Sequence, residues 1–168
     1  SRFGATYKLE FYENADIEQI LARSAKILKV KADQPGLALI AARSRRTPRV
    51  ANRLLKRVRD YTEVKSDGLV NSAVTQKALA MLAVDDLGLE NADRKILEMI
   101  IKKFNGGPVG LQALAASTGE EENTILEVYE PYLLQLGFIN RTTRGREVTA
   151  LAYQHLGLKA PSQTGNLI

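Results

Sequence analysis

Eight cationic side chains lie within residues 43–59, and no acidic residue separates them. In this stretch, Thr47 and Pro48 stand where a helix is expected to begin, because proline is tolerated in the first helical turn and fixes φ there. Arg49 would then lie at a helix N-terminus, which already carries partial positive charge. An arginine there is favourable only when an anion such as a phosphate binds nearby. We therefore predict that Arg49 contacts a phosphate, whereas residues 53–59 read as a solvated basic face.

A second basic group occupies residues 141–146, where Arg141, Arg144 and Arg146 accompany Gly145. The segments on either side can form the two strands of a β-hairpin. Arginines on a hairpin suit contacts with the phosphates of a nucleic acid, which provide affinity without sequence information. We predict such contacts here, and the alternative is an ordinary charged hairpin tip.

The helix expected before this hairpin is acidic. It stands where a helix-turn-helix protein usually places its recognition helix, yet its glutamates would repel DNA. These residues are Glu120, Glu121, Glu122, Glu127 and Glu130. We therefore expect the hairpin, and not the helix, to contact DNA through its backbone, which disfavours a sequence-specific repressor.

The composition excludes several other kinds of site. The chain has no cysteine and one histidine, His155, so a disulfide or thiol nucleophile is excluded and a histidine-centred metal site or triad is remote. The glycine-rich segment 106–110 lacks the lysine and hydroxyl residue of a P-loop, and no complete Walker sequence occurs. We expect no ATP hydrolysis by these residues alone. No apolar run reaches the length of a membrane span, so we expect a soluble cytoplasmic protein.

The elements that must position these side chains are mainly helical. Residues 5–12 alternate in polarity and predict a short strand, at whose end Tyr12 either joins the core or stacks on a base. Helices are expected over residues 16–30, 35–42, 48–61 and 72–84. Further helices are expected over 91–105, 109–116 and 120–135, followed by strands near 138–141 and 147–149 and a helix over 150–156. Three helices followed by a hairpin predict a winged-helix domain.

Charge divides the chain into two parts. Residues 1–84 carry 16 Lys and Arg against 8 Asp and Glu, whereas residues 85–168 carry 8 against 11, so the net charges are +8 and −3. This asymmetry predicts a helical domain over residues 1–84, a winged-helix domain over 85–160 and a flexible tail over 161–168. The first residue is not methionine, and the chain opens directly into the alternating segment, so we expect a preceding part.

Several motifs occur in the order and spacing of a known family. They are Arg-Phe-Gly (2–4), Leu-Glu-Phe-Tyr (9–12), Thr-Pro-Arg-x-Ala-Asn-Arg-Leu-Leu (47–55), Gly-Gly-Pro-Val-Gly-Leu (106–111), Glu-Pro-Tyr-Leu (130–133) and Arg-Thr-x-Arg-Gly-Arg (141–146). Over residues 1–161 the sequence resembles the C-terminal half of the RuvB family of Holliday junction branch-migration ATPases. The resemblance implies an AAA+ small helical lid domain followed by a winged-helix DNA-binding domain.

The resemblance also implies roles for individual residues. Arg49 matches the sensor-2 arginine, which touches the nucleotide of its own subunit, and Tyr12 matches a residue lining that pocket. Arg2 matches the arginine finger, which reaches the γ-phosphate bound by a neighbouring subunit. Permanent charge and forked donors suit arginine to both roles. Arg141 and Arg146 match wing residues that hold the DNA backbone, and Arg144 is a third candidate.

The same resemblance implies partners and a cofactor. The family forms a hexameric motor that uses ATP/ADP, with Mg²⁺ held by a large ATPase domain, and works on duplex DNA at Holliday junctions with RuvA and, in the resolving complex, RuvC. Two positions depart from the family pattern: Arg46 stands where glycine usually precedes Thr-Pro-Arg, and Thr143 stands where the wing turn commonly has proline. The alternatives are a stand-alone winged-helix DNA-binding regulator and an adaptor that binds only protein.

Overall fold

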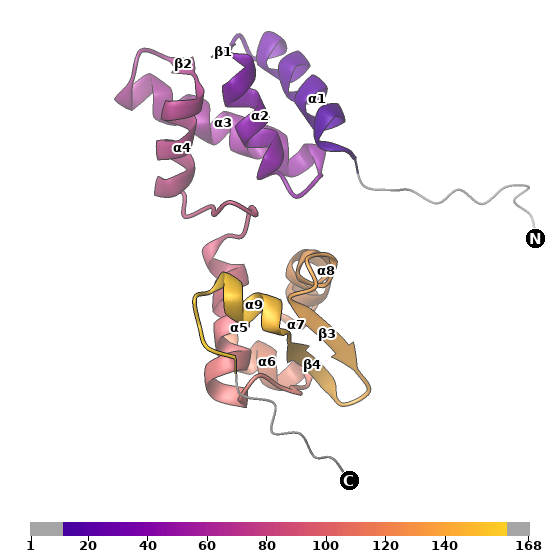
Figure 1. The fold of residues 1–168 in the computed structure, drawn as a ribbon. Helices are drawn as coiled ribbons and strands as arrows, with labels where there is room; N and C mark the ends of the chain where they lie inside the picture. The colour runs from indigo at the N-terminus through magenta and orange to yellow at the C-terminus, as the bar shows by residue number, and fades with distance from the viewer. Residues whose placement is uncertain (1–11, 161–168) are drawn as a thin grey trace, which may run out of the picture. The chain divides into compact units, whose positions relative to one another are not determined.

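The computed structural model describes residues 12–160, and the chain divides into two compact units, residues 1–90 and 91–168 (Figure 1). The candidate arginine finger Arg2, the tail 161–168 and the predicted strand over residues 5–12 lie outside the described residues, except for Tyr12, which is in neither a helix nor a strand. The sequence-based domain boundary between residues 84 and 85 stays a prediction. Each unit is described separately below.

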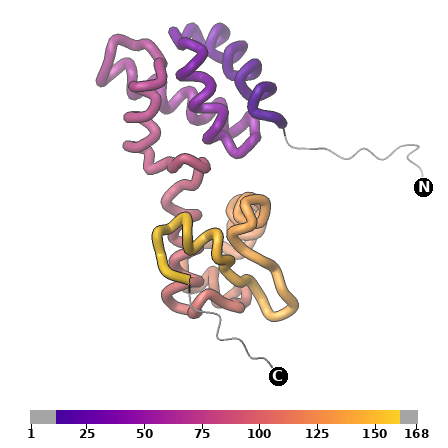
Figure 2. The backbone as a smooth tube through the Cα atoms, viewed as in Figure 1, coloured from indigo at the N-terminus to yellow at the C-terminus, as the bar shows by residue number. Residues whose placement is uncertain are grey.

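The first unit is a bundle of helices. It contains α1 (Asn14–Ile27), α2 (Gln34–Ala42), α3 (Pro48–Lys65) and α4 (Ser72–Met81). Two short strands that the sequence did not predict, β1 (Lys31–Ala32) and β2 (Leu69–Val70), pair in parallel. The backbone tube in Figure 2 shows the course of α1, α2 and α3. Apolar residues of these helices form one buried cluster.

The longest helix of this unit, α3, begins at Pro48 as the sequence predicts and ends at Lys65, four residues after the expected end at Tyr61. Its buried residues recur at helical spacing, with Ala51, Leu54 and Leu55 facing the core. The opposite face carries the exposed residues Arg49 and Lys56. Burial of the apolar face therefore fixes which side chains of α3 point outward.

Side chains define the start of the other helices in this unit. Asp33 caps α2 and Asn71 caps α4 by accepting hydrogen bonds from backbone N–H groups at 2.8 and 2.9 Å. At α1, the capping residue is Glu13, which forms a capping box with Asp16. The short polar residues that end the preceding loops thus set the helix starts.

The second unit has the predicted order of helices followed by a hairpin. Its elements are α5 (Asn91–Phe104), α6 (Leu111–Thr118), α7 (Glu122–Thr124), the π-helix η1 (Ile125–Tyr129), α8 (Glu130–Gln135), β3 (Ile139–Thr142), β4 (Gly145–Val148) and α9 (Ala150–His155). β3 and β4 are antiparallel, with Arg141 opposite Arg146 and Thr142 opposite Gly145. This arrangement is the predicted winged helix.

The third helix of the second unit is interrupted where the sequence predicted one helix over residues 120–135. Pro131 has no N–H group to donate to the carbonyl of Glu127, and just before it the helix widens into η1, where the N–H of Glu130 donates to the carbonyl of Ile125. Glu130 directly follows this π-helix, and only 2% of its surface is exposed. A break in the helix thus lies next to a buried carboxylate.

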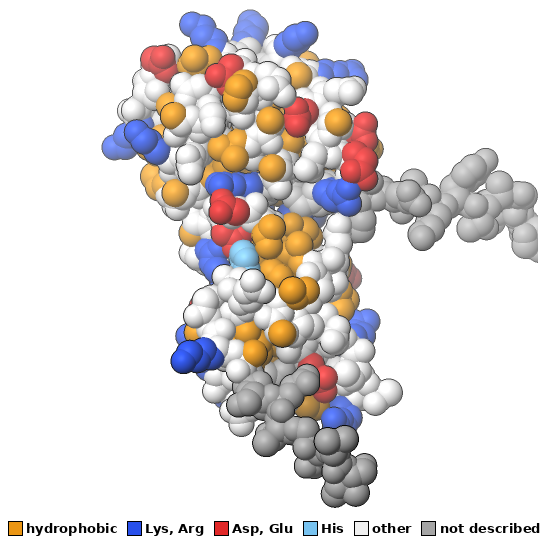
Figure 3. All heavy atoms as spheres, viewed as in Figure 1, with side chains coloured by type: hydrophobic (Ala, Val, Ile, Leu, Met, Phe, Trp, Pro, Cys, Tyr) orange, Lys and Arg blue, Asp and Glu red, His pale blue; other side chains and the backbone are white. Residues whose placement is uncertain are grey.

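The described residues include no helix that is both long enough and apolar enough to cross a membrane. On the face shown in Figure 3, the Lys and Arg side chains of the first unit are spread among Asp, Glu and apolar side chains.

Candidate functional site

Arg49 is the second residue of α3, and its side chain points to solvent. The start of α3 has no side-chain cap, because the hydroxyl of Thr47 donates to the carbonyl of Ser44 at 3.1 Å and does not accept from the helix. No acidic residue lies in the first turn. Pro48 has no N–H group and the N–H of Ala51 donates to the carbonyl of Thr47, so the N–H groups of Arg49 and Val50 and the arginine side chain remain available to an anion.

The loop before this helix holds two residues in a conformation that usually needs glycine. Arg45 and Arg46 both have left-handed backbone angles, with φ of 55° and 54°. Glycine reaches this region without steric cost, which is a physical reason for the glycine that the family resemblance leads us to expect at the position of Arg46. In this chain, Arg46 forms an ion pair of 2.5 Å with Glu13, the residue before α1.

This ion pair brings the start of α1 and the entry to α3 into one region. Tyr12 precedes Glu13 and is 47% exposed, so it does not belong to the core, the first of the two alternatives left open by the sequence. Its exposed ring is available to stack on a ligand. Tyr12 and Arg49 therefore belong to neighbouring segments, while Arg2 lies outside the described residues.

The same loop also fastens the segment 85–90. Arg43 is buried and pairs with Asp86, while Nε of Arg45 donates to the carbonyl of Gly88 at 2.9 Å. From α3, Arg53 pairs with Glu90. The segment is also ordered internally, because Asp85 Oδ1 accepts hydrogen bonds from the N–H groups at 87 and 89. Residues that read as a boundary in the sequence are thus packed against the start of α3.

Leu89 is fully buried beside this loop, and Gly88 is held at a φ of 78°. A Cβ at position 88 would lie 2.5 Å from the carbonyl oxygen of Arg43, which real Cβ atoms do not approach. The backbone at 88 therefore packs directly on the backbone at 43. The close approach leaves no room for any residue other than glycine without a shift of the segment.

The hairpin of the second unit places its three arginines differently. Arg144 is exposed at the tip, where its N–H donates to Thr142 Oγ1 at 3.3 Å. Arg141 lies on β3 with 54% of its side chain exposed, whereas the side chain of Arg146 on β4 is only 12% exposed. The tip and β3 therefore present cations to solvent, and β4 turns its arginine inward.

Arg146 is directed at the buried Glu130. Its Nε and Nη2 donate to Glu130 Oε2 at 3.1 and 3.0 Å, and Nη2 of Arg141 lies 2.6 Å from the other carboxylate oxygen. Among the five glutamates that the sequence assigned to a DNA-repelling helix face, Glu130 thus belongs to the interior. Glu121, Glu122 and Glu127 are exposed as expected.

The backbone anchors the base of this hairpin. Val109 and Arg146 exchange hydrogen bonds of 3.0 and 2.9 Å, so residue 109 adds a bridge to the edge of β4. A Cβ at Gly145 would meet the carbonyl oxygen of Val109 at 2.2 Å, and one at Gly107 would meet that of Arg146 at 2.4 Å. The glycine-rich segment 106–110 is therefore a turn that packs on the hairpin, as its lack of a P-loop lysine indicated.

Sequence reasoning missed Arg43 and Arg45 as structural partners of residues 86–90, and it missed Glu130 as the partner of the hairpin. The run of cations at 43–46 next to the acids at 85, 86 and 90 is a charge signal for the first contact. The Glu-Pro pair at 130–131 is a signal for the helix break next to Glu130.

Two family profiles match the chain in succession. One, described as the RuvB AAA lid domain, matches residues 12–85, and the other, described as the RuvB C-terminal winged helix domain, matches residues 86–157. Two curated relatives carry the name Holliday junction branch migration complex subunit RuvB. The protein from Dehalococcoides mccartyi is 56% identical over 98% of this chain and 47% of its own length, and that from Nostoc punctiforme is 53% identical over 99% and 46%.

Solved structures of relatives agree with this similarity. The Holliday junction branch migration motor RuvB of Thermotoga maritima superposes with a TM-score of 0.89 at 49% identity, covering 95% of this chain and 54% of that one. A structure of its R170A mutant superposes with a TM-score of 0.88 at 48% identity, over 95% of this chain and 53% of that one. The chain spans about half the length of the curated relatives it matches.

Proposed function

The chain belongs to the RuvB family, and from this premise we propose that it serves as the lid and winged helix of an ATP-driven motor that moves Holliday junctions in recombination and repair. The main observation that supports this proposal is the N-terminus of α3, which has no side-chain cap and carries the exposed Arg49. A nucleotide phosphate satisfies both the helix N-terminus and the cation. A stand-alone DNA-binding regulator would leave this pair without an anion.

In this proposal, Arg49 binds phosphate oxygens of the nucleotide held by its own subunit. Tyr12 covers the same pocket with its exposed ring, and Arg2 reaches the γ-phosphate in a neighbouring subunit of a hexamer. ATP supplies the free energy of phosphoryl transfer, while the phosphate-binding loop and the ligands for Mg²⁺ come from residues outside this sequence, which contains no Walker motif. We expect the 168 residues alone to be inactive as an ATPase.

The contacts of the loop 43–47 suggest how the site at Arg49 acts on the rest of the chain. The loop enters α3 just before Arg49 and holds the segment 85–90 through Arg43 and Arg45. A displacement of the start of α3 therefore carries this segment with it. Because residue 90 leads directly into α5, such a displacement reaches the winged helix along the backbone.

At the winged helix, Arg141 and Arg144 bind DNA phosphates from the exposed part of the hairpin. Arg146, which the family resemblance also points to, is held by Glu130 and contributes mainly by fixing the hairpin. Contacts of this kind do not read bases. A motor that moves along any duplex needs a grip of this type.

The proposal predicts a change in DNA binding when both exposed hairpin arginines are removed. The affinity of the whole chain for duplexes of unrelated sequence is measured by fluorescence anisotropy over a range of NaCl concentrations. For Arg141→Ala with Arg144→Ala, we expect weaker binding. The slope of log K against log salt concentration should become less steep by about 1 to 2, since each lost phosphate contact removes about 0.9 from the slope. Circular dichroism should remain unchanged because Arg146 still donates two hydrogen bonds to the buried Glu130 in this variant.

The matched control is Lys56→Ala with Arg57→Ala, which removes two exposed cations from α3. We expect this variant to keep the salt slope of the original chain. Equal loss in both variants would show that net charge, and not the hairpin, governs binding. A strong preference for one duplex sequence would favour the stand-alone regulator instead.

We further propose the family's remaining properties for the whole protein. These are assembly into a hexamer, association with RuvA and, during resolution, RuvC, and a cytoplasmic location. The curated relatives are named as subunits of a branch migration complex, which supports assembly with other proteins.

A further inference from the structure

The carboxylate of Glu130 contacts one arginine from each strand of the hairpin. Its side chain is 2% exposed, and it faces Arg146 from β4 and Arg141 from β3. A buried carboxylate is costly unless cations and hydrogen bonds compensate it. Arg146 and Arg141 supply this compensation at Glu130.

The two arginines are held unequally. Arg146 makes two aligned hydrogen bonds to Oε2 and is almost fully covered. Arg141 lies 2.6 Å from Oε1 as an ion pair, but Oε1 accepts no hydrogen bond from the described residues, and more than half of the Arg141 side chain is exposed. A guanidinium has five N–H donors, so Arg141 can face Glu130 and still offer donors to a phosphate.

We propose that Glu130 sets the strength of the hairpin's grip on DNA by competing with the phosphates for Arg141, while Arg146 stays fixed as an anchor. The inference rests on the proposed function of the hairpin and identifies its positioning residue. Part of the charge of Arg141 is neutralised before DNA arrives, so each contact is weaker and dissociates faster. Arg144, at the tip, has no acidic partner among the described residues and binds at full strength.

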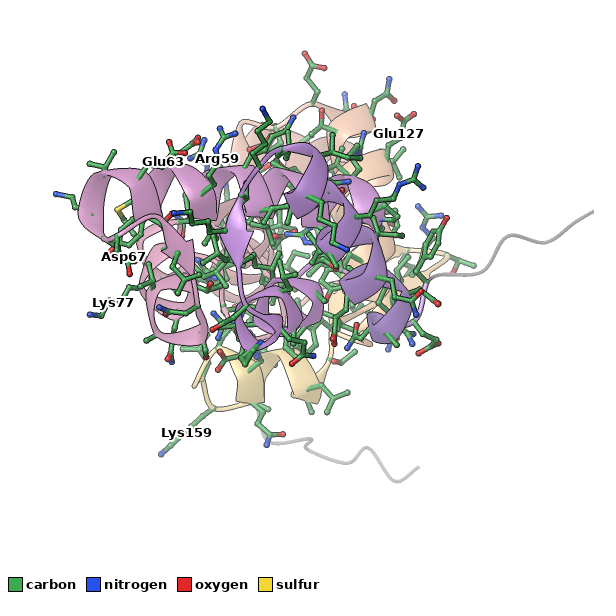
Figure 4. All side chains as sticks on the ribbon, turned by 90° about the horizontal axis from the view of Figure 1, so that it is seen from above. Arg59, Glu63, Asp67, Lys77, Glu127 and Lys159 are labelled. Carbon is green, nitrogen blue, oxygen red and sulfur yellow. The ribbon has the colours of Figure 1, made fainter. Side chains whose placement is uncertain are left out.

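The test is Glu130→Gln, which keeps the shape of the side chain and removes its charge. We expect the whole chain to bind a 30-base-pair duplex about 2- to 5-fold more tightly, the range that releasing one partly exposed ion pair allows, and the salt slope to steepen by up to about 0.9. The matched control is Glu127→Gln, which removes an exposed charge three residues away (Figure 4). It should change the affinity by less.

A mutant cycle separates competition from general electrostatics. The gain in duplex affinity caused by Glu130→Gln should disappear in an Arg141→Ala background and persist in an Arg144→Ala background. A folded Glu130→Gln variant that binds as the original chain does, or more weakly, would overturn the inference. A chain whose binding lacks any salt dependence would instead overturn the proposed function of the hairpin.

If circular dichroism shows that the Glu130→Gln variant does not fold, a second measurement tests whether Glu130 competes for Arg141. Arg141→Ala alone should reduce the salt slope by clearly less than Arg144→Ala does, because Glu130 already neutralises part of the charge on Arg141. Equal reductions by the two variants would contradict the competition.

Discussion

Arginine takes opposite roles at different positions of this chain, and its partners decide which. Arg146 is fixed by Glu130 and Arg43 pairs with Asp86, so both support structure. Arg49 is exposed at a helix start and makes no hydrogen bond or ion pair with the described part of the chain. The unfavourable position of this cation relative to the helix dipole is the reason for proposing that Arg49 binds an anion.

The first residue-scale prediction concerns Arg49. Arg49→Ala should raise the free energy of unfolding by about 0.3–1 kcal/mol, because a positive charge is removed from the N-terminus of α3. Lys56→Ala, in the middle of the same exposed face, is the matched control and should not show this gain. Urea denaturation of the whole chain measures both. A loss of stability in Arg49→Ala would mean that the arginine has a structural partner.

The second residue-scale prediction concerns Asp67, labelled in Figure 4. Hydrogen bonds from the N–H of Leu69 and the hydroxyl of Ser66 hold the pKa of Asp67 below its ordinary value of 3.8. A lowered pKa in the folded state stabilises the protein above the unfolded pKa, and this contribution is lost as pH falls through the folded pKa. Asp67→Asn should therefore be less stable near pH 7, with a difference that shrinks below about pH 4. Urea denaturation at several pH values measures it, and a constant difference would contradict the assignment.

At the scale of elements, the loop 43–47 and the segment 85–90 behave as one structural piece with the start of α3. Arg43 and Arg45 supply polar contacts, and the burial of Leu89 adds an apolar one. The glycine at 88 permits the two backbones to touch. Polar and apolar contacts therefore together hold the segment 85–90 against the start of α3.

This attachment predicts different costs for two glycine substitutions in the first unit. Gly68 and Gly88 share a φ of 78°, but a Cβ at 68 meets nothing within 4 Å, whereas one at 88 meets the carbonyl of Arg43. Gly68→Ala should cost about 1 kcal/mol from backbone strain alone. Gly88→Ala should cost clearly more, and hydrogen exchange at residues 87–89 should accelerate. Equal costs in urea denaturation would argue against direct packing at 88.

At the scale of the whole molecule, charge and DNA contact are predicted to lie on different units. Most of the net positive charge belongs to residues 1–84, yet the exposed hairpin arginines belong to the second unit. Each unit has its own buried apolar residues, such as Leu21 and Leu55 in the first and Leu97 and Leu133 in the second. Separate cores are the basis for separate folding.

We predict that residues 12–90 and 91–160, prepared separately, each unfold cooperatively in thermal denaturation followed by circular dichroism. Salt-dependent duplex binding should remain with 91–160, although its formal charge is near zero, because geometry and not net charge presents Arg141 and Arg144. Binding that remains only with 12–90 would move the DNA contact to the basic first unit. If either fragment fails to fold, the division of the chain into two independently folding units between residues 90 and 91 is wrong.

The linear sequence already determined the order of helices, the start of α3 at Pro48 and the hairpin near residue 145, since these depend on local propensities, prolines and glycines. It also predicted that Arg49 lies at the start of a helix and that Arg141, Arg144 and Arg146 lie on a hairpin, because local residue patterns determine these elements. It did not distinguish Arg146 from Arg141, whose separation depends on Glu130, 16 residues from Arg146 along the chain. Likewise, the attachment of residues 85–90 to Arg43 spans 43 residues. Only the tertiary structure decided these assignments, because burial and ion pairing depend on which distant segments pack together.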